Sequence, residues 1–184
     1  MKGWFLKTAL AAASLGLSYI VPAGSGSAQG SPGDMTGANL PFMPDIRLND
    51  GSGLAFNLSR YKGNVIVLEF WSTTCGPCVR DLDSLNHLQG DFPGKPLAVI
   101  PVNEDPIAIL QVKAALARQK LTFLKPFADP NGNAVEPLHM RGLPTSFVVD
   151  RMGRVVMQFE GPQNWNGADM EKRINFLIFQ SPQP

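Results

Sequence analysis

The sequence has almost no excess charge of either sign, and it lacks a long hydrophobic run. Sixteen Lys and Arg residues stand against fifteen Asp and Glu residues, which gives a formal net charge of +1. So balanced a chain has no general attraction to nucleic acid or to an anionic membrane surface. The apolar stretch at residues 8–21 is shorter than the ~20 residues that comfortably span a bilayer. The composition of the 184 residues indicates one globular domain with an appendage, and nucleic acid is excluded as a partner.

Cysteine is scarce too, because Cys75 and Cys78 are the only two in the chain. A structural disulfide stabilises a protein mainly by closing a long loop, and a ring with two residues between its cysteines removes little entropy. The pair directly follows the apolar run at 65–68, where a strand is expected to give way to a helix. Two thiols in this position can form and reopen a small disulfide ring without a metal or an organic cofactor. We therefore interpret the pair as a redox-active centre that needs no cofactor.

The amino-terminal residues 1–28 have the pattern of a secretory signal. Lys2 and Lys7 precede the uncharged stretch 8–21, and small residues follow up to Ala28. Cleavage after Ala28 or after Ala23 fits the pattern, and an uncleaved membrane anchor through residues 8–21 is the alternative. Residues 29–39 are rich in Gly, Ser and small polar residues, as in a flexible linker. The sequence thus predicts an exported domain at 40–184 in the periplasm or another extracytoplasmic space.

The hydrophobic pattern of this domain predicts a mixed β-sheet with helices on both faces, in the α/β class. Alternating apolar residues at 46–58 predict a hairpin at the sheet edge, and the continuous apolar run at 64–71 predicts a central strand. A helix is expected from the cysteines to about residue 89, then a strand at 97–102. Asp105-Pro106 is expected to open a helix that ends near Gln119. A short helical piece around Pro137, a hairpin at 145–159 and a final helix complete the prediction.

Two motifs give the chain its resemblance to a known family. Cys75-Gly76-Pro77-Cys78 and the later Gly142-Leu143-Pro144-Thr145 together are typical of the thioredoxin fold. More narrowly, the chain resembles the exported TlpA/ResA-like thiol-disulfide oxidoreductases over about residues 40–179, with an amino-terminal hairpin and an inserted strand and helix at about 97–119. It departs from them at Thr74, where the family usually has a second tryptophan. Pro101 falls where thioredoxin has a buried lysine.

Three residues are expected to carry the chemistry. Cys75 stands at the start of a helix, where unpaired N–H groups and the helix dipole lower the pKa of a thiol, so it is the predicted nucleophile. Cys78, one turn later, is expected to be more buried and to act as the resolving thiol. Glu69 lies inside an apolar strand, where an unpaired carboxylate costs several kcal/mol. The resemblance aligns it with the buried aspartate of thioredoxin and implies a general acid or base, whereas the alternative is a partly exposed glutamate at a strand end.

Further residues are expected to contact the substrate. The resemblance implies a cis peptide bond between Leu143 and Pro144, which would place the Leu143 backbone where an extended segment of a partner could pair with it. Gly76 and Pro77, between the cysteines, belong to the same predicted surface. Trp71 is either a contact surface or a core aromatic.

The resemblance implies a reductase of protein disulfides, serving cytochrome c maturation or copper-site assembly, with a membrane thiol donor upstream. The Gly-Pro dipeptide favours this reading, because thioredoxin has the same dipeptide and lies near −270 mV on the scale of potentials. A disulfide oxidase or isomerase of the same fold is an alternative. A copper chaperone that binds Cu(I) through Cys75, Cys78 and His139 is another. A peroxidase is less consistent with the sequence, since no Pro-x-x-x-Thr-x-x-Cys pattern surrounds Cys75.

Overall fold

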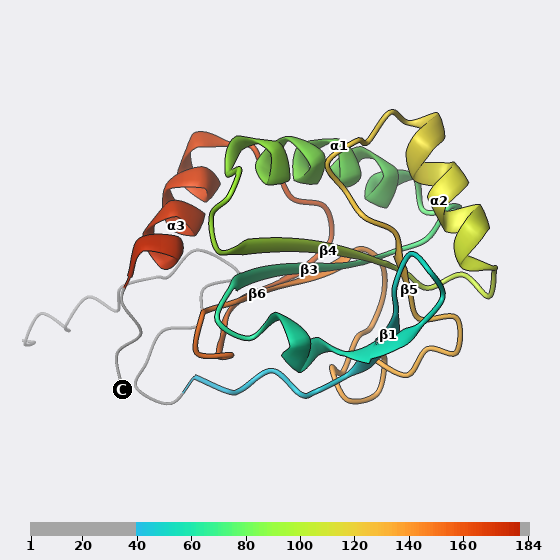
Figure 1. Ribbon diagram of the computed structural model, residues 1–184, viewed down its shortest axis with the longest axis horizontal. Coiled ribbons are helices and arrows are strands. Elements are labelled where there is room, and N and C mark those ends of the chain that lie inside the picture. The colour runs from blue at the N-terminus through green and yellow to red at the C-terminus, as the bar shows by residue number, and fades with distance from the viewer. Residues whose placement is uncertain (1–39, 181–184) are drawn as a thin grey trace, which may run out of the picture.

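The computed structural model describes residues 40–180 and contains a seven-stranded mixed sheet in the order β2-β1-β5-β4-β3-β6-β7 (Figure 1). The strands are β1 (Arg47–Asn49), β2 (Ala55–Asn57), β3 (Val65–Trp71), β4 (Leu97–Asn103), β5 (Phe127–Ala128), β6 (Thr145–Val149) and β7 (Val155–Glu160). The helices are the 3-10 helix η1 (Leu58–Tyr61) and the α-helices α1 (Gly76–Asp91), α2 (Ile109–Arg118) and α3 (Ala168–Phe179). The predicted signal or anchor (1–28) and the linker (29–39) lie outside the described residues.

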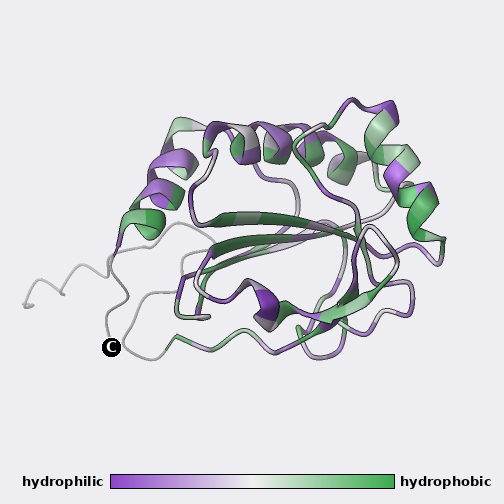
Figure 2. Ribbon diagram, viewed as in Figure 1, coloured by the Kyte–Doolittle hydropathy of each residue, from purple (hydrophilic) through white to green (hydrophobic). Residues whose placement is uncertain are grey.

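Strand β3 is the centre of the sheet, as its continuous apolar sequence predicts. All seven of its residues are buried, and it pairs with β4 in parallel and with β6 antiparallel. Both β3 and β4 are hydrophobic over most of their length (Figure 2). A strand covered on both faces needs apolar side chains on both faces, which explains why β3 lacks the alternation of a half-exposed strand. The one carboxylate in β3, Glu69, is therefore placed inside the protein.

The predicted crossover from β3 to a parallel strand and the two predicted hairpins are confirmed. The chain passes from β3 through α1 to the parallel strand β4, and then through α2 to β5, which is parallel to β4. The amino-terminal hairpin β1–β2 lies at one edge of the sheet, and β6 and β7 form the antiparallel hairpin at the other. The two-residue strand β5 was not predicted. It joins the hairpin to the sheet, since Asn49 of β1 pairs with Ala128 of β5.

The prediction of helices on both faces is wrong, because α1, α2 and α3 all pack on one face (Figure 1). Hairpin residues, η1 and the segment after β5 cover the opposite face. The helical piece expected around Pro137 is a series of turns from 133 to 139. Proline has no N–H to donate within a helix, and His139 has a positive φ of 51°, so a helix cannot continue through this segment.

The predicted start of α2 at Asp105-Pro106 is also wrong. The helix begins at Ile109, after Ala108 at the N-cap, and the Gln111 side chain accepts a hydrogen bond from the Ala108 N–H at 3.0 Å. Asp105 instead directs its carboxylate to the segment in front of the cysteines, as described below. A tertiary contact has replaced the local cap.

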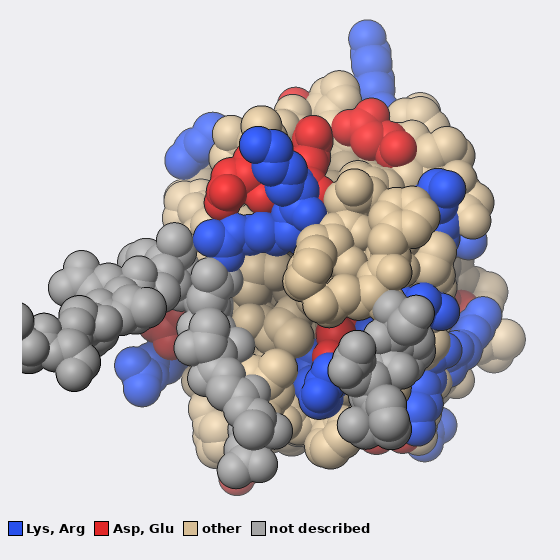
Figure 3. Space-filling view, turned by 90° about the vertical axis from the view of Figure 1, so that its left-hand side faces the viewer, with Lys and Arg blue, Asp and Glu red and all other residues tan. Residues whose placement is uncertain are grey.

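Basic and acidic side chains share the end of the molecule seen in Figure 3, which agrees with the balanced charge of the chain. Within residues 40–180, no helix has both the length and the apolar character needed to cross a membrane.

Candidate active site

The two cysteines lie at the start of α1 and are joined in a disulfide, with their Cα atoms 5.3 Å apart. Cys75 is the N-cap of the helix, and its sulfur accepts a hydrogen bond from the Cys78 N–H at 3.3 Å. Pro77 occupies the first turn, where its missing N–H costs nothing. The sulfur of Cys75 is therefore at the positive end of the helix dipole, an environment that favours a thiolate.

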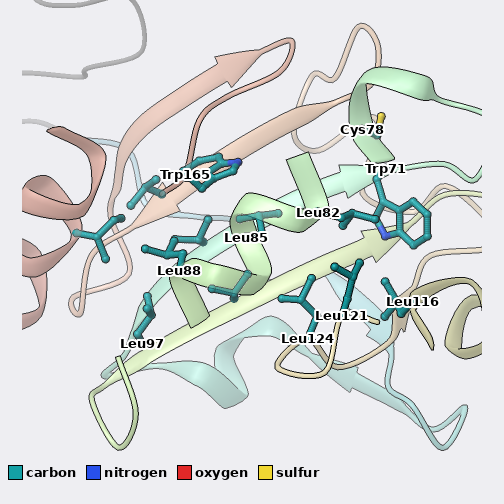
Figure 4. Close-up of a cluster of buried hydrophobic side chains, with 14 of the residues drawn as sticks. Trp71, Cys78, Leu82, Leu85, Leu88, Leu97, Leu116, Leu121, Leu124 and Trp165 are labelled. Atoms are coloured by element: carbon teal, nitrogen blue, oxygen red, sulfur yellow. The ribbon is translucent and has the colours of Figure 1, made fainter. Parts of the chain in front are cut away.

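The two sulfurs differ in their access to solvent. Cys75 is half-buried, whereas Cys78 is completely buried and belongs to the core cluster under α1. In Figure 4, Cys78 lies above Trp71 at one end of this cluster, which continues along α1 through Leu82, Leu85 and Leu88. A substrate disulfide can thus reach Cys75 but not Cys78.

A hydrogen-bond network that the sequence did not predict holds the segment in front of Cys75. The Asp105 carboxylate accepts from the Ser72 hydroxyl at 2.6 Å, from the Thr73 N–H at 2.8 Å and from the Asn103 side chain at 3.1 Å. Ser72 in turn contacts the Thr74 hydroxyl at 2.9 Å, and its carbonyl accepts from the Cys75 N–H at 3.2 Å. The loop after β4 therefore fixes the entry to the cysteine motif. Burial opposes the ionisation of Asp105, but its hydrogen bonds outweigh that effect and hold its pKa below the usual value.

The neighbouring Glu104 is a second carboxyl group in an unfavourable environment. Its N–H donates to the Trp71 carbonyl at 2.9 Å, and its Oε1 is buried with no hydrogen-bond partner among the residues that the structure describes. Burial, followed by the nearby charges of Asp129 and Asp105, raises the pKa of Glu104 to about 8. No pattern in the sequence distinguished this glutamate from an exposed one after a strand.

Glu69 is fully buried, so the alternative of a partly exposed glutamate at a strand end is wrong. Its side chain lies on the α1 face of β3, because it alternates in register with Val67 and Trp71 of the cluster under that helix. Its Oε2 accepts from the Trp165 indole N–H at 3.0 Å and from the Ser146 hydroxyl at 3.1 Å. Its Oε1 has no hydrogen-bond partner among the described residues.

This environment keeps Glu69 protonated near neutrality. Burial is the main cause that raises its pKa to about 8, and the Asp81 charge on α1 adds to it. The hydrogen bonds from Trp165 and Ser146 act in the opposite direction. Asp81 is one turn after Cys78 on α1, and it accepts a hydrogen bond from the Gln163 N–H, in the same loop as the Trp165 that donates to Glu69.

The loop at 142–144 lies at the same end of the sheet as the cysteines, since Thr145 pairs with Phe70 near the carboxyl end of β3. The Leu143–Pro144 peptide bond is cis, as the resemblance implies. Pro144 is buried and Leu143 is 37% exposed. Gly76 is exposed, and nothing lies within 4 Å of the position that a Cβ would take there. Leu143 is therefore exposed to solvent at the end of the sheet where the cysteines lie.

Trp71 does not belong to that surface. Its side chain is fully buried within the cluster under α1, and its Nε1 has no hydrogen-bond partner among the described residues (Figure 4). The prediction of Trp71 as a substrate contact is therefore wrong, because its place as the last residue of a fully covered strand makes it a core aromatic. Nor does His139 join the cysteines. Within residues 40–180, no group of three or more His, Cys, Asp or Glu side chains could hold a metal ion.

A buried and a half-buried cysteine at the start of a helix that follows a central strand, with a cis-proline loop beside them, define a thiol-disulfide oxidoreductase of the thioredoxin fold. The family model Redoxin matches residues 38–174, and the chain belongs to this family.

Among curated relatives, the chain is similar to the thiol-disulfide oxidoreductase ResA of Geobacillus kaustophilus (strain HTA426), with 32% identity over 135 residues, 73% of this chain and 75% of the relative. ResA of Bacillus thuringiensis subsp. konkukian (strain 97-27) is 31% identical over 121 residues, 65% of this chain and 68% of the relative. A solved structure described as a thiol:disulfide interchange protein DsbE from Chlorobium tepidum has a TM-score of 0.67 and 29% identity, and the match covers 76% of this chain and 96% of that one.

Proposed function

We propose that this protein is an exported reductase of protein disulfides, in which Cys75 is the nucleophile, Cys78 the resolving thiol and Glu69 the group that exchanges a proton with Cys78. The observation that carries the proposal is the asymmetry of the pair. Cys75 is accessible at the start of α1, whereas Cys78, in the first turn of the same helix, is fully buried. This arrangement favours one order of attack, because only Cys75 can meet a disulfide on another protein.

The reaction consists of two exchanges. The Cys75 thiolate attacks one sulfur of the substrate disulfide, forming a mixed disulfide and releasing the other substrate sulfur as a thiolate. Cys78 then loses its proton and attacks the Cys75 sulfur, which releases the second substrate sulfur. The substrate gains two electrons and two protons, and Cys75 and Cys78 are oxidised to the disulfide. A thiol donor must afterwards return two electrons to the pair.

Glu69 is suited to the second exchange. A buried thiol ionises with difficulty and needs a nearby base. The pKa of Glu69, about 8, lies far above the ordinary value of a carboxyl group, so its carboxylate form is a stronger base than an exposed carboxylate and is better suited to accept the proton of a buried thiol. The carboxylate form receives the Cys78 proton, and the neutral form returns it to the departing substrate thiolate.

The cellular setting of the proposal comes from the sequence and from the similarity to ResA and DsbE. The signal pattern at 1–28 supports export to the periplasm or another extracytoplasmic space, with anchoring through residues 8–21 as the alternative to cleavage. The Gly-Pro dipeptide supports the reducing direction. The proposed substrates are proteins of cytochrome c maturation or of copper-site assembly. The proposed electron donor is a membrane thiol protein that re-reduces Cys75 and Cys78.

A redox titration tests the direction of electron flow. The protein is equilibrated with defined ratios of reduced and oxidised dithiothreitol, and the free thiols are then alkylated and counted by mass spectrometry. A reductase is expected to have a potential near −270 mV, as thioredoxin has. A value near −120 mV, as in strong disulfide oxidants, would reject the reductase and favour the oxidase.

A further inference from the structure

Trp165 is the residue of the site that lies farthest from the cysteines in the sequence. It belongs to the loop between β7 and α3, and its indole is fully buried in the cluster under α1 (Figure 4). Its Nε1 donates a hydrogen bond of 3.0 Å to the Oε2 of Glu69, across 96 positions of sequence. A buried indole N–H is usually paired with an acceptor, and for Trp165 the acceptor is the carboxyl group of Glu69.

The loop that carries Trp165 is tied to α1 itself. The Trp165 N–H donates to the Ser84 hydroxyl at 3.2 Å, and the Gln163 N–H donates to the Asp81 carboxylate at 2.8 Å. The indole also packs edge to face against Phe159, with ring centroids 5.8 Å apart. The two backbone hydrogen bonds and the ring contact together fix the loop and its indole relative to the helix that begins at the cysteines.

The hydrogen bonds distinguish the two oxygens of Glu69. Trp165 and Ser146 both donate to Oε2, whereas Oε1 has no hydrogen-bond partner in the described part of the chain. An indole N–H can only donate, so Oε2 must be an acceptor in both protonation states of the carboxyl group. A protonated oxygen is the poorer acceptor, so in neutral Glu69 the two donors at Oε2 favour the proton on Oε1.

We propose that Trp165 is a positioning residue of the redox reaction, whose indole N–H holds Glu69 so that Oε1 is the oxygen that gives and receives the proton. The inference rests on the proposed function, in which Glu69 exchanges that proton with Cys78. The groups that face Glu69 are Asp81 from α1, whose charge opposes ionisation, and the neutral donors Ser146 from β6 and Trp165. Trp165 thus orients the carboxyl group and stabilises its charged form, which keeps it available as a base.

The direct test is a pH titration of the indole N–H resonances of the oxidised protein labelled with ¹⁵N-tryptophan. Cys75 and Cys78 cannot titrate in this state, and the Glu69→Gln variant separates the effect of Glu69 from that of Glu104, whose pKa is also about 8. The Trp165 resonance is expected to shift with a midpoint near 8, the pKa of Glu69, and Glu69→Gln should abolish the shift. The Trp71 resonance is the internal control, because its buried Nε1 has no hydrogen-bond partner within residues 40–180, and it should show no shift that Glu69→Gln abolishes. A Trp165 resonance that does not move from pH 6 to pH 10 would overturn the inference.

The functional test is the pH profile for reduction of a disulfide peptide by the reduced protein. Trp165→Phe keeps a buried ring but removes the donor to the carboxylate, so the inflection due to Glu69 should move upward by about one pH unit. The ionised fraction below the midpoint would then fall about tenfold. Trp71→Phe is the matched control, since it removes an indole N–H that donates to no residue between 40 and 180, and the same inflection should stay in place.

The variants Glu69→Gln and Trp165→Phe together distinguish an error in the role of Trp165 from an error in the proposed role of Glu69. If Glu69→Gln leaves the profile unchanged, the role of Glu69 in the proposed function is wrong, whatever Trp165 does. If Glu69→Gln removes the inflection but Trp165→Phe does not move it, the role of Trp165 is wrong and that of Glu69 stands. Should Trp165→Phe fail to fold, the pH titration of the indole resonances in the unaltered protein still tests the role of Trp165.

Discussion

Replacement of Glu69 by glutamine should make the stability of this protein less dependent on pH. Below pH 4.5 the carboxyl group is protonated in both the folded and the unfolded chain. Between 4.5 and about 8 the folded protein keeps a proton that the unfolded chain has released, so the free energy of unfolding falls as the pH rises. Above about pH 8 the folded protein holds the buried charge of Glu69, and the free energy of unfolding falls no further through this group.

The size of the effect follows from the pKa. The interval from 4.5 to about 8, at roughly 1.4 kcal/mol for each pH unit, corresponds to a loss on the order of 5 kcal/mol. That is a large share of the roughly 5–15 kcal/mol that stabilises an ordinary domain. Glutamine has nearly the same shape and can accept the same hydrogen bonds from Trp165 and Ser146, but it never carries the charge. We expect Glu69→Gln to change stability by about 1 kcal/mol or less at pH 5 and to increase it by several kcal/mol at pH 9.

The assay is urea unfolding of the oxidised protein at both pH values, followed by circular dichroism. Glu160→Gln is the control, because this carboxylate on β7 is half-exposed and its variant should differ from the parent protein by a similar, small amount at both. The quantity of interest is the change in the effect of Glu69→Gln between pH 5 and pH 9. Glu104 contributes the same pH dependence to both proteins and cancels from this difference. An equal effect at the two pH values would refute the assignment of Glu69 as a buried, protonated acid.

Three further predictions concern the cysteines and their surroundings. Cys78→Ser should retain a mixed disulfide between Cys75 and a substrate, visible on non-reducing gels, and the absence of any adduct from cells would contradict the proposed order of attack. Asp105→Ala leaves the Thr73 N–H without its acceptor and should lower the free energy of unfolding in urea by about 1–3 kcal/mol. An unchanged midpoint would show that this hydrogen bond does not stabilise the loop. Leu143→Asp should slow reduction of a protein disulfide at least tenfold but that of a small aromatic disulfide less than twofold, and equal losses would argue against strand pairing at this loop.

Much of the fold could be predicted because the relevant signals are local. The apolar run of β3, the proline in the first turn of α1 and the turn residues of the two hairpins each specify one element. Asp105 shows the limit of such reasoning. Its sequence context is that of a helix cap, but the folded chain offers it three donors near the cysteines, and these outweigh a single local bond.

The candidate site likewise combines residues that the sequence predicts with residues that only the structure reveals. Cys75, Cys78 and Glu69 were predictable, because a thiol pair at a strand-to-helix boundary and a carboxyl group inside an apolar strand are visible in the sequence. Ser146 left a weak signal as a polar residue in an apolar strand. Trp165 left none, since nothing in its local pattern relates it to a glutamate 96 positions away.

The sequence by itself determined where the thiol pair and the carboxyl group of Glu69 stand and which helix and strand carry them, because spacing and hydrophobicity act between neighbours in the chain. Only the tertiary structure decided how those residues are tuned. It buried Trp71 instead of exposing it, placed Trp165 against Glu69, and directed Asp105 to the loop before Cys75. The physical reason is that burial and hydrogen bonding depend on which segments meet in space, and the energy of a buried charge depends on all of them together.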